Sequence, residues 1–251
     1  MPRATCFTRR GFLTTASAGA LAGVAGCDEA PSLVSDAELA AMGERAWAEI
    51  REQIAPSREA DLTQVTAEVS TQLLRAAGEA PSDWEVQVFA SPQINAFALP
   101  GGKIGVYEGM FQAARTRDQL AAIIGHEIGH LQAEHSKKRV SAQIARDAGV
   151  QLIARVLEMG DVAFAREIAA ALGVGIDVGL VLPYNRDQEL EADALGLMTM
   201  NAAGFNAAET ITLWERMTQL NNRRSPEFLA THPSPGSRIA EIEAILPSLE
   251  A

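Results

Sequence analysis

The chain contains few cysteines and few histidines. Its 251 residues include two cysteines, Cys6 and Cys27. Cys6 lies in a segment that we expect to be removed, and Cys27 is a candidate for acylation, so no disulfide is expected even in an oxidising compartment. The same scarcity leaves no cysteine free to act as a zinc ligand or nucleophile. A metal site would therefore have to use the four histidines together with carboxylates.

Basic residues are also in deficit. The chain has 21 Lys and Arg against 32 Asp and Glu, which gives a formal net charge of −11. This charge argues against nucleic acid as a partner and against electrostatic adhesion to anionic lipid. Attachment to a membrane would then require a lipid anchor rather than a basic patch.

Long apolar runs of the kind that cross a membrane are missing as well. Residues 11–26 are uncharged, but the run is short and rich in glycine. Residues 168–183 are apolar except for Asp177, and they too are few for a membrane span. We interpret residues 141–182 as helical and increasingly apolar, either a buried helical arm or a surface that faces substrate, with core packing favoured.

The first residues have the features of an export leader. Arg9 and Arg10 precede an apolar run, which resembles the twin-arginine signal of bacteria. The run ends in Val24-Ala25-Gly26-Cys27, which resembles a lipobox; the alternative is an ordinary secretory signal with a chance cysteine. We therefore predict a signal peptide at 1–26, a lipidated anchor and tether at 27–34, and one catalytic domain at 35–251. The predicted location is the bacterial cell envelope, facing the periplasm, with the inner or outer membrane left open.

The rest of the chain alternates between helical and extended patterns. Ser35 with Glu38 is typical of a capped helix start, and a second helix is expected over residues 61–77. Three strands are expected at 84–89, 95–99 and 103–107, the last two joined as a hairpin through Pro100-Gly101-Gly102. Helical sequence dominates from about residue 116 onward. This order predicts an α+β fold, rich in helix, with a small antiparallel sheet.

One helical segment carries the pattern His-Glu-x-x-His. His126 and His130 are four residues apart, so they share one face of a helix and can both reach one Zn²⁺. Glu127 lies one step round the helix, where it can take a proton from a water molecule that zinc activates. The alternative is a chance match on an exposed helix. The apolar run at 120–124 argues against it, because two buried imidazoles without a partner would be costly.

A catalytic zinc ion needs a third protein ligand. His135 falls one residue before the position that zinc proteases with a third histidine use, on a helix that we expect to continue, so we assign it a partly exposed structural role. Glu189 and Asp193 are a better pair: at i and i+4 they share a helix face, so one could bind zinc while the other holds a histidine through its second ring nitrogen. Glu191 is expected to point elsewhere. The alternative is a solvated acidic helix start.

Four blocks of the sequence together resemble the M48 zinc peptidases. These blocks are 95–109, 125–135, 189–193 and 231–238. The resemblance implies a zincin fold of the gluzincin type, one Zn²⁺ per chain held by His126, His130 and Glu189, and Glu127 as the general base. It also places Asp193 behind a zinc ligand. The membrane-spanning members of the family carry long apolar segments that this chain lacks, so it resembles the small single-domain members.

The same resemblance implies further site residues. The strand that includes Asn95, Ala96 and Phe97 would line the cleft and pair with an extended substrate. His232 and Arg238 would lie near the active site, where they could stabilise an oxyanion. In some relatives the loop histidine caps the zinc, so a latent state is left open, and so is a role for His232 as a helix cap.

These inferences favour a zinc-dependent metalloendopeptidase that hydrolyses misfolded or misassembled cell-envelope proteins. The expected partners are protein or peptide substrates, a membrane reached through the lipid on Cys27, and an envelope assembly machinery, with no nucleic acid. A first alternative is an envelope chaperone or assembly factor with latent or weak protease activity. A second is a structural zinc domain, which would need His232 as a fourth ligand.

Overall fold

The computed structural model describes residues 32–159, 184–221, 227–232 and 235–249. The chain divides into two compact units, Met1–Pro31 and Ser32–Ala251. The predicted leader, the lipobox and Cys27 fall in the first unit and lie outside the described residues, as does the predicted helical arm beyond residue 159. Within the described part, no helix combines the length and apolar character that a membrane crossing requires.

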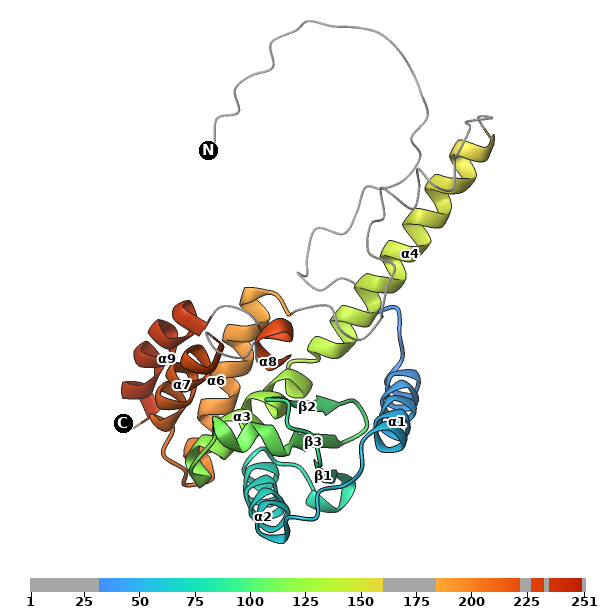
Figure 1. Ribbon diagram of the computed structural model, residues 1–251. Coiled ribbons are helices and arrows are strands. Elements are labelled where there is room, and N and C mark those ends of the chain that lie inside the picture. Colours follow the sequence, from blue (N-terminus) through green and yellow to red (C-terminus); the bar gives the residue numbers. More distant parts are fainter. Residues whose placement is uncertain (1–31, 160–183, 222–226, 233–234, 250–251) are drawn as a thin grey trace, which may run out of the picture. The chain divides into compact units, whose positions relative to one another are not determined.

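The described part of the second unit is rich in helix, with one small sheet (Figure 1). Its elements, in chain order, are α1 (Asp36–Gln53), α2 (Ala60–Ala76), η1 (Pro81–Asp83), β1 (Glu85–Phe89), β2 (Ala96–Leu99), β3 (Lys103–Tyr107), η2 (Glu108–Gln112), α3 (Arg117–Gln132), α4 (His135–Met159), α6 (Arg186–Ala202), α7 (Glu209–Asn221), α8 (Glu227–Thr231) and α9 (Pro235–Leu249). The helix-rich α+β prediction is confirmed, and so is the capping box of Ser35 and Glu38 at the start of α1.

The sheet differs from the prediction in one respect. Strands β2 and β3 form the expected antiparallel hairpin, but β1 pairs with β3 in parallel, so the sheet is mixed, with the order β1-β3-β2. The prediction of a purely antiparallel sheet is therefore wrong. The physical reason is the burial of β3, whose Ile104 and Val106 are fully buried. The central place in the sheet buries the most apolar surface, so β3 inserts between β1 and β2.

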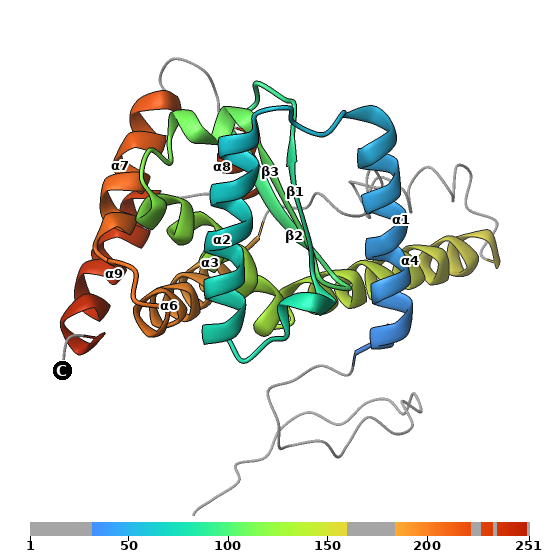
Figure 2. The same cartoon turned by 90° about the horizontal axis from the view of Figure 1, so that it is seen from below.

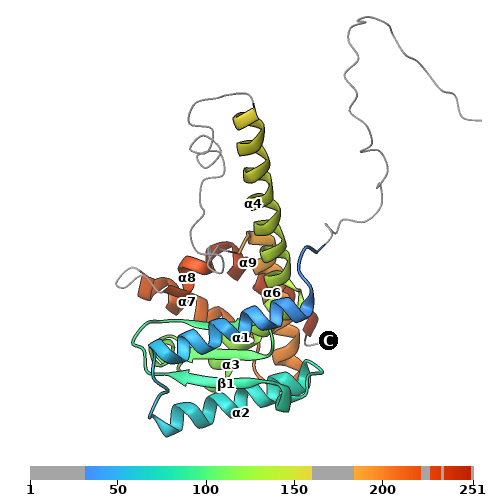
Figure 3. The same cartoon turned by 90° about the vertical axis from the view of Figure 1, so that its right-hand side faces the viewer.

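Helices cover both faces of this sheet. Helix α1 lies on one face, and α2 and α3 lie on the other (Figures 2 and 3). On its side away from the sheet, α3 packs against α6 and α7, and α9 packs in turn against both of those helices. Helix α3 is buried without interruption from Gln119 to His130, which is expected of a helix enclosed on all sides. The main apolar core surrounds it, with Ile123, Ile124 and Trp214 among its members.

The chain changes direction where α3 ends. Glu134 adopts a left-handed backbone conformation with φ of 54°, and a new helix, α4, begins at His135. Left-handed φ is uncommon for a residue other than glycine and marks a real interruption of the helix. The prediction that the helix continues through His135 is therefore wrong, and the break changes the role of this histidine.

Candidate active site

The paired histidines come from the buried centre of α3. Thr116 caps the helix by accepting a hydrogen bond from the backbone N–H of Gln119. Ten residues along the chain, His126 lies one helical turn before His130, and both side chains are almost fully buried. Their Nε2 atoms are 3.0 Å apart. The two nitrogens therefore converge on the same small volume.

Helix α6 approaches α3 closely enough to bring a carboxylate to this volume. A Cβ atom at Gly129 would lie 2.6 Å from the carbonyl oxygen of Ala192, and one at Gly196 would lie 3.0 Å from the backbone nitrogen of His126. Only glycine allows two backbones to come this near. Asn185 and Gln188 form the predicted capping pair, so α6 starts at Arg186, three residues before Glu189. The glycines thus set the distance between the two helices that carry the site.

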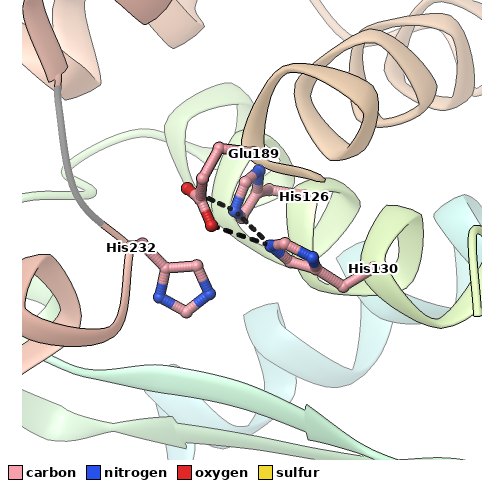
Figure 4. Close-up of side chains that lie close together, drawn as sticks. All are labelled: His126, His130, Glu189 and His232. Carbon is pink, nitrogen blue, oxygen red and sulfur yellow. Dashed lines mark hydrogen bonds and ion pairs between the residues drawn. The ribbon is translucent and has the colours of Figure 1, made fainter. Parts of the chain in front are cut away.

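Glu189 completes a three-donor cluster with the two histidines (Figure 4). Its Oε1 is 3.3 Å from Nε2 of His130, and its Oε2 is 3.7 Å from Nε2 of His126. Bonds of roughly 2.0–2.1 Å to a tetrahedral Zn²⁺ would separate ligand atoms by about 3.3–3.4 Å. The three separations in the structure, 3.0, 3.3 and 3.7 Å, bracket this value.

The polar atoms of the cluster lack the partners that burial requires. Oε1 of Glu189 and Nε2 of His232 are buried without a hydrogen bond. Such atoms are costly unless something binds them, and a divalent cation among two imidazoles and a carboxylate would do so. The donor set therefore fits a metal ion, and its mixture of nitrogen and oxygen ligands suits zinc best.

Asp193 and Arg238 lie directly behind the cluster. Asp193 Oδ1 is 2.9 Å from Nδ1 of His126, and both of its oxygens accept hydrogen bonds of 2.6 Å from Arg238. Arg238 is fully buried, its Nη1 atom is 2.6 Å from Oε2 of Glu189, and its guanidinium stacks on the ring of Trp214. In this structure Arg238 is thus bound to the two carboxylates of α6 rather than directed toward open space.

Glu127 points toward the sheet. Its Oε2 accepts a hydrogen bond of 3.1 Å from the backbone N–H of Ala98 in β2. Its Oε1 has no hydrogen-bond partner and lies 3.5 Å from Nε2 of His232. One oxygen of the carboxylate is therefore held by the main chain, and the other faces the cluster.

His232 reaches the site from the segment after α8 (Figure 4). Its ring stacks on Phe228, and its Nδ1 lies 3.2 Å from the carbonyl oxygen of that residue and 2.9 Å from Oγ1 of Thr231. Thr231 Oγ1 itself donates to the same carbonyl, so a proton on Nδ1 of His232 satisfies the group best. In the neutral ring the lone pair is then on Nε2, the atom that faces the other ligands.

Burial determines the proton affinities in the cluster. It raises the pKa of Glu127 to about 8, with the charge of Glu189 acting in the same direction, and it raises the pKa of Glu189 itself to about 8. It lowers the pKa of His126 to about 4 and that of His232 well below its ordinary value. Burial would also raise the pKa of Asp193, but Arg238 and His126 outweigh it and lower that pKa to about 2. The histidines are therefore neutral and free to bind a metal ion near neutral pH.

His135 does not have the partly exposed role predicted for it. It is fully buried, and its Nδ1 is 2.9 Å from Nδ1 of His130. Its Nε2 is 3.0 Å from Oε2 of Glu191, which is half exposed and lies outside the metal cluster, as predicted. The error for His135 follows from the unforeseen break at Glu134, which turns this residue toward α6 and Glu191.

Tyr184 is a site residue that the sequence analysis missed. Its ring stacks on His130 with 3.8 Å between centroids and 18° between planes, and the guanidinium of Arg139 covers it at 4.0 Å. Its backbone N–H donates to the carbonyl of Thr231. The available signal was an aromatic residue directly before the Asn185 cap, but no motif links such a residue to a histidine over 50 positions earlier.

The predicted substrate strand forms one edge of the sheet. In the described part of the chain β2 pairs with β3 alone, and the N–H of Ala98 faces away from β3 because it donates to Glu127. Ala96 is buried, and Phe97 packs in an aromatic cluster with Trp47, Phe89 and Tyr107. Asn95 accepts a hydrogen bond from Tyr107 through its carbonyl and so extends the pairing of β2 with β3.

Comparison with known proteins identifies the class to which this fold and site belong. The family model "Peptidase family M48" matches residues 56–246, so the chain belongs to this family. It is 35% identical over 190 residues to the mitochondrial metalloendopeptidase OMA1 of Schizosaccharomyces pombe. The aligned residues make up 75% of this chain and 54% of that protein. It is 34% identical over 151 residues to the OMA1 of Arabidopsis thaliana, 60% of this chain and 29% of that protein.

A bacterial relative is similar over a comparable stretch. The chain is 27% identical over 189 residues to the beta-barrel assembly-enhancing protease of Escherichia coli O157:H7, which is 72% of this chain and 38% of that protein. The alignments thus cover between 29% and 54% of these three relatives.

These relatives correct the predicted location. Two of the three are mitochondrial by name and one is bacterial. The prediction of a bacterial cell-envelope location facing the periplasm is therefore wrong: the family members span mitochondria and bacteria. The prediction rested on the leader and anchor expected at residues 1–34, which lie before the matched range 56–246.

Proposed function

We propose that this chain is a zinc-dependent endopeptidase that cleaves misfolded or misassembled membrane proteins. The observation that carries the proposal is the convergence of His126, His130 and Glu189 from two helices, with Glu127 beside them. The names of the relatives, two metalloendopeptidases and a protease that enhances β-barrel assembly, support the activity and the class of substrate.

His126, His130 and Glu189 would hold the metal ion. When bound, zinc supplies Lewis acidity, which makes water a nucleophile near neutral pH and polarises a peptide carbonyl. Asp193 accepts a hydrogen bond from Nδ1 of His126 and so keeps the lone pair of that ring on Nε2. Arg238 neutralises the charge of the carboxylates from behind.

Glu127 would act as the general base. Its Oε2 stays bonded to the N–H of Ala98, so Oε1 is the atom that takes a proton from water and returns it to the leaving amine. Burial raises the pKa of this carboxyl group above its ordinary value, which makes the carboxylate a stronger base. The unpaired edge of β2 would bind the extended substrate main chain next to this carboxylate.

The test compares two variants with the same chemical change. Glu127→Gln should retain zinc but reduce chelator-sensitive cleavage of casein by at least about 100-fold. Glu215→Gln, on the exposed side of α7, is the matched control and should cleave like the natural chain. Retention of cleavage by Glu127→Gln would contradict the mechanism, and a purified chain that takes up no zinc would contradict the site itself.

We also propose that Cys27 carries a lipid that attaches the chain to a membrane. The small residues before it support this proposal, since lipid-transfer signals require them. Cys27→Ser should move the protein to the soluble fraction and abolish labelling with a radioactive fatty acid, whereas Cys6→Ser should change neither. Equal labelling of both variants would contradict the proposal.

A further inference from the structure

The two histidine ligands differ in the side chain that contacts their Nδ1 atom. Nδ1 of His126 contacts a carboxylate directly, whereas Nδ1 of His130 contacts a second imidazole, that of His135, at 2.9 Å. His135 in turn contacts Glu191 through Nε2 at 3.0 Å. Glu191 is half exposed, with 52% of its side chain accessible, while His135 is fully buried. A chain of three side chains therefore leads from the surface to the metal-binding face of His130.

The hydrogen-bonding capacities of these groups allow one arrangement of neutral rings. If Nε2 of His130 binds a metal ion, its ring proton must be on Nδ1. That proton can be donated only to a lone pair on Nδ1 of His135, so the proton of His135 is on Nε2. There it is donated to the carboxylate of Glu191, which as an anion only accepts. In this arrangement each of these three side chains has its hydrogen bonds satisfied, and Nε2 of His130 is the atom that faces the metal site.

His135 cannot itself belong to the cluster of donors. It contacts His130 on the Nδ1 side of the ring, whereas the metal-binding volume lies on the Nε2 side. The described cluster of candidate ligands accordingly contains His126, His130, Glu189 and His232 without His135. Tyr184 stacks on the face of His130, so ring rotation is blocked from that direction too.

We infer that His135 and Glu191 form a positioning pair that holds His130 in the ring orientation and tautomer required for metal binding. This inference rests on the proposed zinc site. The pair depends on the break at Glu134, which starts α4 at His135 and turns its ring toward α6. Partners of this kind behind a metal-bound histidine contribute about 10- to 100-fold to metal affinity.

Zinc affinity of the full chain, measured by competition with a chromophoric chelator, tests the pair. Glu191→Ala should weaken zinc binding about 10-fold, and Glu191→Gln less, because the amide oxygen still accepts a hydrogen bond. Asp187→Ala is the matched control: it removes the same charge from an exposed position of the same helix and should bind zinc like the natural chain. The visible spectrum of the cobalt-substituted chain should change in Glu191→Ala and not in the control.

Substitutions at His135 separate positioning from packing. His135→Ala should weaken zinc binding by up to about 100-fold, and His135→Asn should restore part of the affinity, because its oxygen can accept from Nδ1 of His130. The double variant with Glu191→Ala should bind no more weakly than His135→Ala, because Glu191 acts through His135. Thermal unfolding of the zinc-free variants reports any loss of packing.

Three results would overturn the inference. Unchanged zinc affinity and cobalt spectra in Glu191→Ala and His135→Ala would do so while leaving the peptidase proposal intact. Affinity losses that only follow losses of zinc-free stability, with no recovery in His135→Asn, would make His135 a packing residue. Failure of the natural chain to bind zinc would overturn both proposals. The zinc competition assay on the natural chain distinguishes this result from the other two.

Discussion

At the scale of single residues, the site consists of ionisable groups that are almost fully buried, with the positive charge of Arg238 next to the carboxylates. Arg238 forms two hydrogen bonds with Asp193 and one close ion pair with Oε2 of Glu189, whereas Oε1 of Glu189 is buried without a hydrogen bond. Such a buried oxygen is costly unless it is protonated or bound to a further cation. The proton and the metal ion are therefore expected to compete for the same carboxylates.

Glu127 should make the zinc-free protein less stable at higher pH. Burial raises its pKa from 4.5 to about 8, so the folded protein binds this proton more tightly than the unfolded chain. The stability that the proton contributes is present below 4.5 and is lost as the pH rises through 8. In Glu127→Gln this loss cannot occur, so the zinc-free variant should lose less stability over this range than the zinc-free natural chain.

Denaturant unfolding at about pH 5 and about pH 8 measures this effect, which should amount to a few kcal/mol at most. Glu189 and His126 are present in both proteins, so the comparison isolates the proton of Glu127 together with its coupling to Glu189. Parallel pH profiles of the two proteins would show that Glu127 is not buried as a proton-binding group.

His232 should restrain the activity. Its Nε2 carries the lone pair in the favoured tautomer and lies within 4.8 Å of the other donor atoms, which suits a fourth ligand and a latent state. His232→Ala should therefore increase the peptidase rate on a small peptide, with zinc content unchanged. A fall of about 100-fold would instead assign His232 to stabilisation of the oxyanion.

At the scale of elements, the contact between α3 and α6 controls the geometry of the metal site. The backbones meet at Gly129 and Ala192, and a Cβ atom at Gly129 would lie 2.6 Å from a carbonyl oxygen, a separation that real side chains do not show. The helices would have to move apart, which would carry Glu189 away from the histidines.

Gly129→Ala should therefore destabilise the fold by about 1–3 kcal/mol and weaken zinc binding as well. Gly236→Ala in α9 is the matched control, because a Cβ atom there meets nothing within 4 Å. Denaturant unfolding and zinc competition on both variants provide the comparison. Full zinc affinity in Gly129→Ala would show that the spacing of the helices does not limit the site.

At the scale of the whole molecule, metal binding and folding should be coupled. The donors come from α3 and α6, elements separated by more than 50 residues in the sequence, and the unfolded chain does not hold them together. Zinc that binds the folded state alone stabilises it by about 2.7 kcal/mol at a free concentration 100 times the Kd.

Removal of zinc by a chelator should lower the Tm by about 5–10 °C, the shift that such a free energy produces in a domain of this size. Addition of zinc should restore the Tm in the natural chain, whereas Glu189→Gln should show a much smaller response. Identical Tm values with and without zinc in the natural chain would show that the ion is not bound at a folded site.

The predictions from sequence succeeded where one local pattern was enough. The helix that carries His126 and His130, the capping of α6 and the hairpin of β2 and β3 all depend on residues within a few positions of one another. The errors concern longer-range relations. Parallel pairing of β1 with β3 depends on which strand the helices bury, and the break at Glu134 has no glycine to announce it.

The sequence by itself determined the chemistry that is available: two imidazoles one turn apart, a base beside them, carboxylates spaced along a second helix, and no cysteine after residue 27 to compete. These properties follow from helical periodicity and residue type, which are local. Only the tertiary structure decided that Arg238 neutralises Asp193, that Tyr184 covers His130, and that His135 links His130 to Glu191. Such contacts join segments distant in the chain, and burial makes them strong by excluding the water that would otherwise take their place.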